Sequence, residues 1–132
     1  VDYRMNVPRV MVCVTRQKTC ERLIKIGRKL VNGEGKLTVV HVIKAEANVL
    51  GNPDEGEALE YLFQVSKQAG ADMTVLRSDD ILNTLLDYAK KNHITEIVMG
   101  ESPDPGSGNS IIRNMEHMLP SIKFNVIPSL EF

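Results

Sequence analysis

Five short apolar runs alternate along the chain with segments in which apolar residues recur every three or four positions. The short runs predict strands at residues 9–15, 36–43, 72–77, 96–99 and 123–127. The first two runs are apolar at consecutive positions rather than alternate ones, which is typical of strands buried on both faces of a parallel sheet.

The segments between these runs predict four helices, each with one apolar face. They cover residues 19–31, residues 53 to about 69, a stretch that follows Asp80, and a stretch from Asn109 or Ser110 to Pro120. The side chains expected in the core are Leu23, Ile24, Gly27, Leu30 and Val31, then Leu59, Leu62, Phe63 and Ser66, then Ile81, Leu82, Leu85, Leu86 and Ala89, and finally Ile111, Ile112, Met115 and Met118.

Residues typical of helix ends support these boundaries. Asn52 is expected to be the N-cap of the second helix, with Pro53 at its first position and Glu55 three residues after the cap. Asp79 and Asp80 are expected to cap the third helix. Strands that alternate with helices in this way predict an α/β fold, in which helices cover both faces of a doubly wound parallel sheet.

Composition places the chain among ordinary single globular domains, here residues 1–132. It is 42% hydrophobic and 25% charged, and its net charge of −1 gives no reason to expect nucleic acid as a partner. No apolar run approaches the roughly 20 residues that cross a bilayer, so no membrane insertion of this segment is expected. With two cysteines and no apolar leader in residues 1–9, a cytoplasmic location is expected.

Ligands of such sheets bind beyond the carboxyl ends of the strands. The residues expected there are Val14, Thr15, Val42, Ser78, Met99 and Gly100. They include no Ser/His/Asp group, no acidic pair and no P-loop lysine, so no catalytic residue and no enzyme activity are predicted. The loop after Gly100 lies between a strand and a helix, where many α/β proteins hold phosphate.

Six segments of the chain match one known pattern in order and spacing: VMVCVT, CERLI, VVHVI, DILNTLLDYAKKNHITEIVMG, SIIRNMEHMLP and VIPS. Together they resemble a universal stress protein (UspA-like) domain over nearly the whole chain. The start, VCVT followed by CERLI, resembles the version found in potassium-responsive sensor histidine kinases. The resemblance implies a Rossmann-like sheet with strand order 3-2-1-4-5, a role in stress response, and a homodimer formed through the last strand.

The resemblance also implies a nucleotide site, from which this chain departs. Nucleotide-binding members carry Gly-x-x-Gly and, later, Gly-Ser or Gly-Thr; Met99, Gly100 and Ser110 match the two ends of that motif. Pro103 stands at the second glycine and removes a backbone N–H that could face a phosphate. Thr15 replaces an aspartate that holds adenosine in the family, and the loop between Gly100 and Ser110 is shorter than the family pattern.

Two interpretations of this loop stay open. In one, the backbone and side chains of Gly106, Ser107, Gly108, Asn109 and Ser110 form an anion site at a helix N-terminus. In the other, Asn109 or Ser110 is only an N-cap and the glycines are a surface connection. The carboxylates of Glu101 and Asp104, which repel phosphate, favour the second interpretation.

Three functions follow from these observations. The first is a non-catalytic stress-response or signalling module with a degenerate nucleotide site. The second is a weak ATP-binding, or ATP-hydrolysing, stress protein that uses the loop from Gly100 to Ser110, with ATP or another adenine nucleotide as the candidate ligand. The third is a regulatory ligand-sensing domain of a larger kinase or transporter.

A few other residues invite a function, but each has a simpler interpretation. Lys18, Arg22, Lys25 and Lys29 are spaced along one helix face, which is expected to be a solvated face rather than a docking surface for an acidic partner. Cys20 is expected to be a partly exposed, unreactive cysteine. His41 is expected to be a hydrogen-bonded core or rim residue, and no metal site is predicted.

Overall fold

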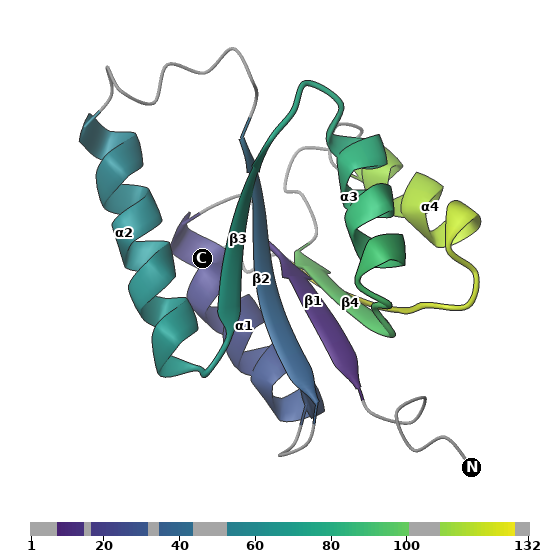
Figure 1. The fold of residues 1–132 in the computed structure, drawn as a ribbon, viewed down its shortest axis with the longest axis horizontal. Helices are drawn as coiled ribbons and strands as arrows, with labels where there is room; N and C mark the ends of the chain where they lie inside the picture. The colour runs from purple at the N-terminus through teal and green to yellow at the C-terminus, as the bar shows by residue number, and fades with distance from the viewer. Residues whose placement is uncertain (1–7, 15–16, 32–34, 44–52, 101–108, 129–132) are drawn as a thin grey trace.

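The computed structural model describes residues 8–14, 17–31, 35–43, 53–100 and 109–128, and these form a layered α/β fold (Figure 1). Along the chain the elements are β1 (Arg9–Cys13), α1 (Gln17–Val31), β2 (Lys36–Ile43), α2 (Pro53–Gln68), β3 (Asp72–Arg77), α3 (Ile81–Lys91), β4 (Glu96–Gly100), α4 (Asn109–Met118) and β5 (Lys123–Ile127). None of these helices is long and apolar enough to cross a lipid bilayer.

The five strands form one sheet in the order β3-β2-β1-β4-β5, and every neighbouring pair is parallel. The predicted fold class and strand order are confirmed. β1 lies at the centre, with Val12 level with Val39 of β2 and with Val98 of β4. The strand order therefore reverses between β1 and β4, because β2 and β3 lie on one side of β1 while β4 and β5 lie on the other.

Helices cover both faces of the sheet, with α1 and α2 on one face and α3 and α4 on the other (Figure 1). Successive side chains of β1 point to opposite faces. Val10, Val12 and Val14 pack with α1 and α2, whereas Met11 and Cys13 pack with α3 and α4. All five are buried, which explains why the first strand is apolar at consecutive positions.

α1 lies close against the central strands because it carries a glycine where it crosses them. A Cβ atom at Gly27 would lie 2.6 Å from Cγ2 of Val12 and 2.9 Å from Cδ1 of Leu37. Both distances are shorter than carbon atoms can approach without displacement. The absence of a side chain at Gly27 thus sets the separation between α1 and the sheet.

The predicted cap of α3 is confirmed, and it connects the end of β3 to this helix. Oδ1 of Asp80 accepts a hydrogen bond from the amide of Asn83 at 3.2 Å, and the Thr84 hydroxyl donates to the Asp80 carbonyl at 2.7 Å. Gly70, which ends α2, has φ +71°, a conformation that glycine adopts without steric cost.

Several expectations were wrong in detail. Phe63 and Met118, expected in the core, are 51% and 50% exposed, because Phe63 lies where α2 covers the edge of the sheet and Met118 ends α4. The strand predicted at residues 9–15 ends at Cys13, α1 begins at Gln17 rather than at residue 19, and β4 extends to Gly100. The predicted Asn52 cap lies outside the described residues.

Candidate functional site

The candidate site lies at the carboxyl edge of the sheet between β1 and β4, where the strand order reverses. Cys13 is level with Met99, so Val14 follows β1 at the same height as Gly100 at the end of β4. Gly100 is in turn level with Ile127 of β5. Val14, Met99 and Gly100, expected together from the sequence, are brought together by this register.

Gly100 lies at a position where the described surroundings do not require a glycine. Its φ is not positive, and a Cβ atom there would lie 3.4 Å from Cδ1 of Leu23, an ordinary van der Waals contact. Neither backbone strain nor packing therefore requires glycine at this exposed position. A glycine of this kind lets a ligand approach the backbone closely.

The carbonyl of Val14 already has a partner inside the protein. Nδ1 of the half-buried His41 lies 2.7 Å from it, and because a carbonyl only accepts, Nδ1 carries the proton. The Val14 amide donates to the Val40 carbonyl at 3.0 Å. The expectation that His41 is a hydrogen-bonded rim residue is confirmed. Its ring therefore lies beside the residue that precedes Thr15.

Three of the predicted site residues, Met99 among them, serve the framework of the fold. Val42 packs against the core under α3 and α4, and Met99 is buried in that core. Ser78 follows β3, two strands away from β1, and its Oγ accepts a hydrogen bond from the Asp80 amide at 3.0 Å. Ser78 therefore supports the start of α3 and does not lie at the reversal point.

Thr15, Gly106 and Gly108 lie outside the described residues. Asn109 and Ser110 are the first two residues of α4, as expected, but only their backbone placement is described. The phosphate-binding and N-cap interpretations of this loop both stay predictions.

No family model matches the chain. Sensor protein KdpD from two strains of Mycobacterium tuberculosis is 30% identical to it over 96 residues, which make up 71% of this chain and 11% of KdpD. The chain thus spans about a ninth of the length of these curated relatives.

Solved structures show the same architecture over almost the full length of both of the chains compared. A universal stress protein family member from Burkholderia pseudomallei is 14% identical, with a TM-score of 0.64 over 93% of this chain and 97% of that one. The chain has the universal stress protein fold. The resemblance seen in the sequence is confirmed at the level of the fold.

Two further structures with this fold contain a nucleotide. The universal stress protein from Archaeoglobus fulgidus in complex with dAMP is 17% identical, with a TM-score of 0.56 over 92% of this chain and 96% of that one. A universal stress protein in complex with cAMP is 14% identical, with a TM-score of 0.60 over 93% and 97%.

In this version of the universal stress protein fold, α1 contacts the residue after β5 through Arg22, one of the basic residues spaced along one face of the helix. Nη1 of Arg22 donates to the Pro128 carbonyl at 2.9 Å. Lys25 pairs with Glu21 at 3.3 Å on the surface of the helix, and Lys29 is exposed. These contacts agree with a solvated face. Sequence spacing could not indicate the Arg22 contact, which joins residues 106 positions apart.

Both cysteines are buried, and the expectation of a partly exposed Cys20 was wrong. Because α1 begins at Gln17, Cys20 takes an inward position one turn before Leu23 and Ile24, and its exposed fraction is 0%. Burial raises the pKa of the Cys20 thiol above its usual value and outweighs the hydrogen bond from the Glu21 amide, which lowers it. Burial also raises the pKa of Cys13 to about 12. Neither thiol is activated.

Proposed function

We propose that this chain is a non-catalytic regulatory module with the universal stress protein fold and a degenerate nucleotide site. One observation carries the proposal: three polar side chains near the carboxyl edge, His41, Ser78 and Asp80, already hold other parts of the protein. His41 donates to Val14, and Ser78 and Asp80 hold the start of α3. A group committed to the framework is poorly placed to act as a nucleophile or a general base.

The sequence adds two departures that weaken a nucleotide site without removing it. Thr15 carries no charge where relatives place an aspartate, and Pro103 offers no amide to a phosphate. Gly100 nevertheless leaves its backbone open to a ligand. The dAMP and cAMP complexes of proteins with the same fold support an adenine nucleotide as the ligand class. Weak ATP binding, with or without hydrolysis, is therefore the first alternative.

The match to KdpD supports a second alternative, in which the chain senses a ligand for a larger kinase or transporter. The identity of 30% is higher than that of any structural relative described above. Since the matched residues make up 11% of KdpD, the match supports a role as one module of a larger sensor and not the activity of the whole protein. The regulatory role that we propose fits either a free-standing module or one joined to a larger protein.

The experiment that tests the proposal is calorimetric titration with ATP, AMP and cAMP, comparing the natural chain with Thr15→Asp. If the site is degenerate but otherwise intact, the natural chain binds weakly and Thr15→Asp binds at least about tenfold more tightly, an interaction of the size expected for a charged hydrogen bond. Ser121→Asp is the matched control, because this exposed residue precedes β5 at the opposite edge of the sheet.

Two results would contradict the proposal. Tight ATP binding by the natural chain, or turnover of ATP that is lost in Gly100→Val, would make the chain a working nucleotide-binding protein or an enzyme. An equal gain in Ser121→Asp would show that added charge acts nonspecifically.

Native mass spectrometry of the same samples would also report co-purified nucleotide. Its dependence on protein concentration tests the homodimer that we propose through β5, an edge strand whose Phe124, Val126 and Ile127 are half-buried.

A further inference from the structure

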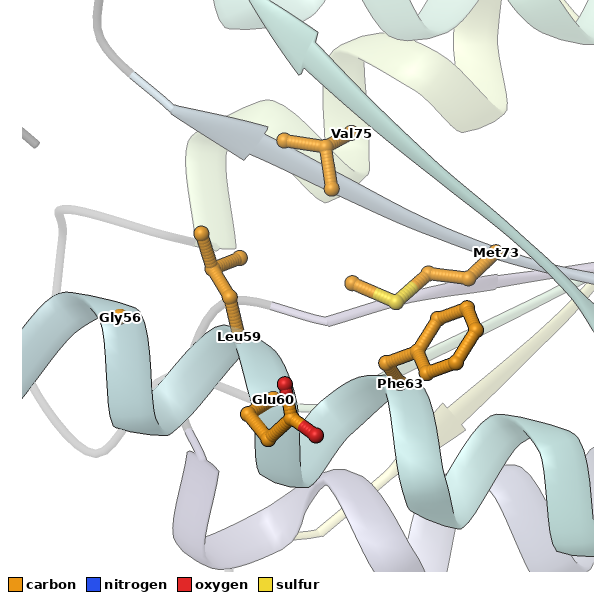
Figure 2. A pocket seen from close by; sticks show the side chains of 6 residues that line it. All are labelled: Gly56, Leu59, Glu60, Phe63, Met73 and Val75. Atoms are coloured by element: carbon orange, nitrogen blue, oxygen red, sulfur yellow. The ribbon is translucent and has the colours of Figure 1, made fainter.

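A second surface, remote from the reversal point, has the features of a docking groove. A hollow of about 320 Å³ lies between α2 and β3 (Figure 2). Leu59 and Phe63 from the helix and Met73 and Val75 from the strand point into it, with Glu60 at its rim. A Cβ atom at Gly56 would meet no atom within 4 Å, so this end of the groove is open.

Exposed apolar side chains gather around this groove. Phe63 is 51% exposed and Val75 42%, and these are two of the four large exposed hydrophobic residues in the described part of the chain. Single exposed apolar residues are common on protein surfaces, but a cluster that lines a hollow indicates a site of interaction.

The floor of the groove is the edge strand of the sheet, because β3 pairs with β2 and ends the strand order. The Ser78 amide donates to the Ile43 carbonyl of β2 at 2.9 Å, and backbone groups alternate in direction along a strand. The backbone groups of Val75 and Met73 therefore point away from β2. The residues whose side chains line the groove are those whose main chain can pair with an added strand.

An added strand would also bury the apolar wall. It would lie about 4.8 Å from β3, beneath the part of α2 that extends past the edge. Its alternate side chains would project to the α2 face of the sheet and into the space bounded by Leu59, Phe63 and Val75. Main-chain pairing and side-chain burial are thus available to the same extended segment.

Charge indicates which kind of segment fits. α2 carries Asp54, Glu55, Glu57 and Glu60 but a single basic residue, Lys67. A second copy of the chain, joined edge to edge through β3, would place two such acidic helices side by side on one face of the combined sheet, and they would repel. A segment rich in Lys or Arg would instead meet opposite charge at the rim.

We propose that the groove between α2 and β3 binds an extended, cationic and apolar segment of a partner protein, which adds a strand to the edge of the sheet at β3. Apolar side chains of the segment fill the groove beside Phe63 and Val75, and its basic side chains lie near Glu60. This surface is separate from the carboxyl-edge site, so the docking does not depend on nucleotide binding.

The test uses a synthetic peptide in which Lys and Val alternate, titrated into the isotope-labelled full chain and followed by amide NMR shifts. The expected result is saturable shifts at Val75 and Met73. A peptide with Glu in place of Lys, and one with Pro in place of its central Val, are expected not to bind. Phe63→Ala and Glu60→Lys are each expected to weaken binding about fivefold or more.

The chain offers matched controls for both variants. Met118 of α4 is 50% exposed, so Met118→Ala removes a comparable apolar surface elsewhere, and Glu116→Lys reverses an exposed charge on the same helix. Neither control is expected to change peptide affinity. Absence of binding, equal binding of the Glu peptide, shifts confined to other elements, or self-association through β3 without peptide would each overturn the proposal.

Discussion

α1 and α2 cover the same face of the sheet but are held to it very differently. α1 contributes Cys20, Leu23, Ile24 and Val31 to the buried cluster on that face, whereas α2 contributes Leu62. The second helix adds the buried Ser66, whose hydroxyl donates to the Leu62 carbonyl of its own helix at 2.8 Å. α1 is part of the framework, and α2 is attached at the margin.

The position of each helix over the sheet explains this difference. α1 packs against β1, β2 and β4, so strands lie beneath its whole width, and Gly27 lets it approach them. α2 lies over β3, beyond which the sheet ends, and Phe63 therefore stays half exposed at the margin of the sheet. The same fold thus places a rigid support beneath the candidate ligand site and an open apolar surface at the sheet margin.

The largest expected effect contrasts one glycine from each helix. Gly27→Val should destabilise the protein by about 2–3 kcal/mol, because the new side chain overlaps Val12 and Leu37 and forces α1 away from the sheet. Gly56→Ala in α2 meets open space and should stabilise the helix by about 0.5–1 kcal/mol. Urea unfolding of the two variants measures both changes.

The two variants are expected to change the free energy of unfolding in opposite directions. Gly27→Val should lower the urea midpoint without a change in slope, as expected when the native state alone is affected. If Gly27→Val unfolds at the same urea concentration as the natural chain, α1 is not set by close packing. A loss of stability in Gly56→Ala would contradict the view that α2 is free of packing constraint at that position.

A smaller effect is expected at alkaline pH, and it probes how completely α1 and the sheet bury their thiols. Burial raises the pKa of Cys13 from 9.0 to about 12 and that of Cys20 in the same direction. Above pH 9 the unfolded chain loses thiol protons that the folded chain keeps. The stability contributed by these groups is therefore fully present below pH 9 and is lost as pH rises toward the pKa of the folded state.

Urea midpoints between about pH 8 and about pH 11 should fall more steeply for the natural chain than for Cys13→Ala/Cys20→Ala. Lysine and tyrosine titrate in both proteins, so the difference between the two slopes isolates the thiols. Alkylation of the native chain should be slow for the same reason. Parallel slopes, or rapid alkylation of Cys20 without unfolding, would show that the thiols are accessible.

The sequence predicted what depends on periodicity and on local capping, and it failed where the answer depends on neighbours. Alternating strands and helices predicted the α/β class, and Asp80 predicted the start of α3. Helical spacing placed Phe63 on the inner face of α2, but periodicity cannot tell whether a strand lies beneath that face. The strand order that makes β3 an edge was implied by the family resemblance and not by the local pattern.

The candidate site was predictable to a lesser degree. Gly100 and Val14 could be placed at the carboxyl edge because parallel strands end together. The hydrogen bond from His41 to Val14 joins residues 27 positions apart and depends on the pairing of β1 with β2, which no local motif encodes. Whether the loop after Gly100 forms an anion site or only a surface connection stays a prediction.

The smallest expected effect concerns the hydrogen bond that joins the two helices on the surface. The Tyr61 hydroxyl of α2 donates to Oε2 of Glu21 in α1 at 3.0 Å. This bond raises the pKa of Tyr61 and, together with Lys25, lowers the pKa of Glu21. Stability contributed by Glu21 is present above its unperturbed pKa of 4.5 and is lost as pH falls further.

Glu21→Gln should move the pKa of Tyr61 down toward its usual value and barely change the urea midpoint, because exposed polar pairs contribute little to stability. Ultraviolet titration of tyrosinate measures the pKa, and Tyr61→Phe identifies its share of the signal. Glu57→Gln, which removes an exposed carboxylate from α2 itself, should leave that pKa unchanged. An unshifted Tyr61 in Glu21→Gln would mean that the two helices are not joined at this point. A large loss of stability would mean that α2 depends on α1 far more than its few buried side chains indicate.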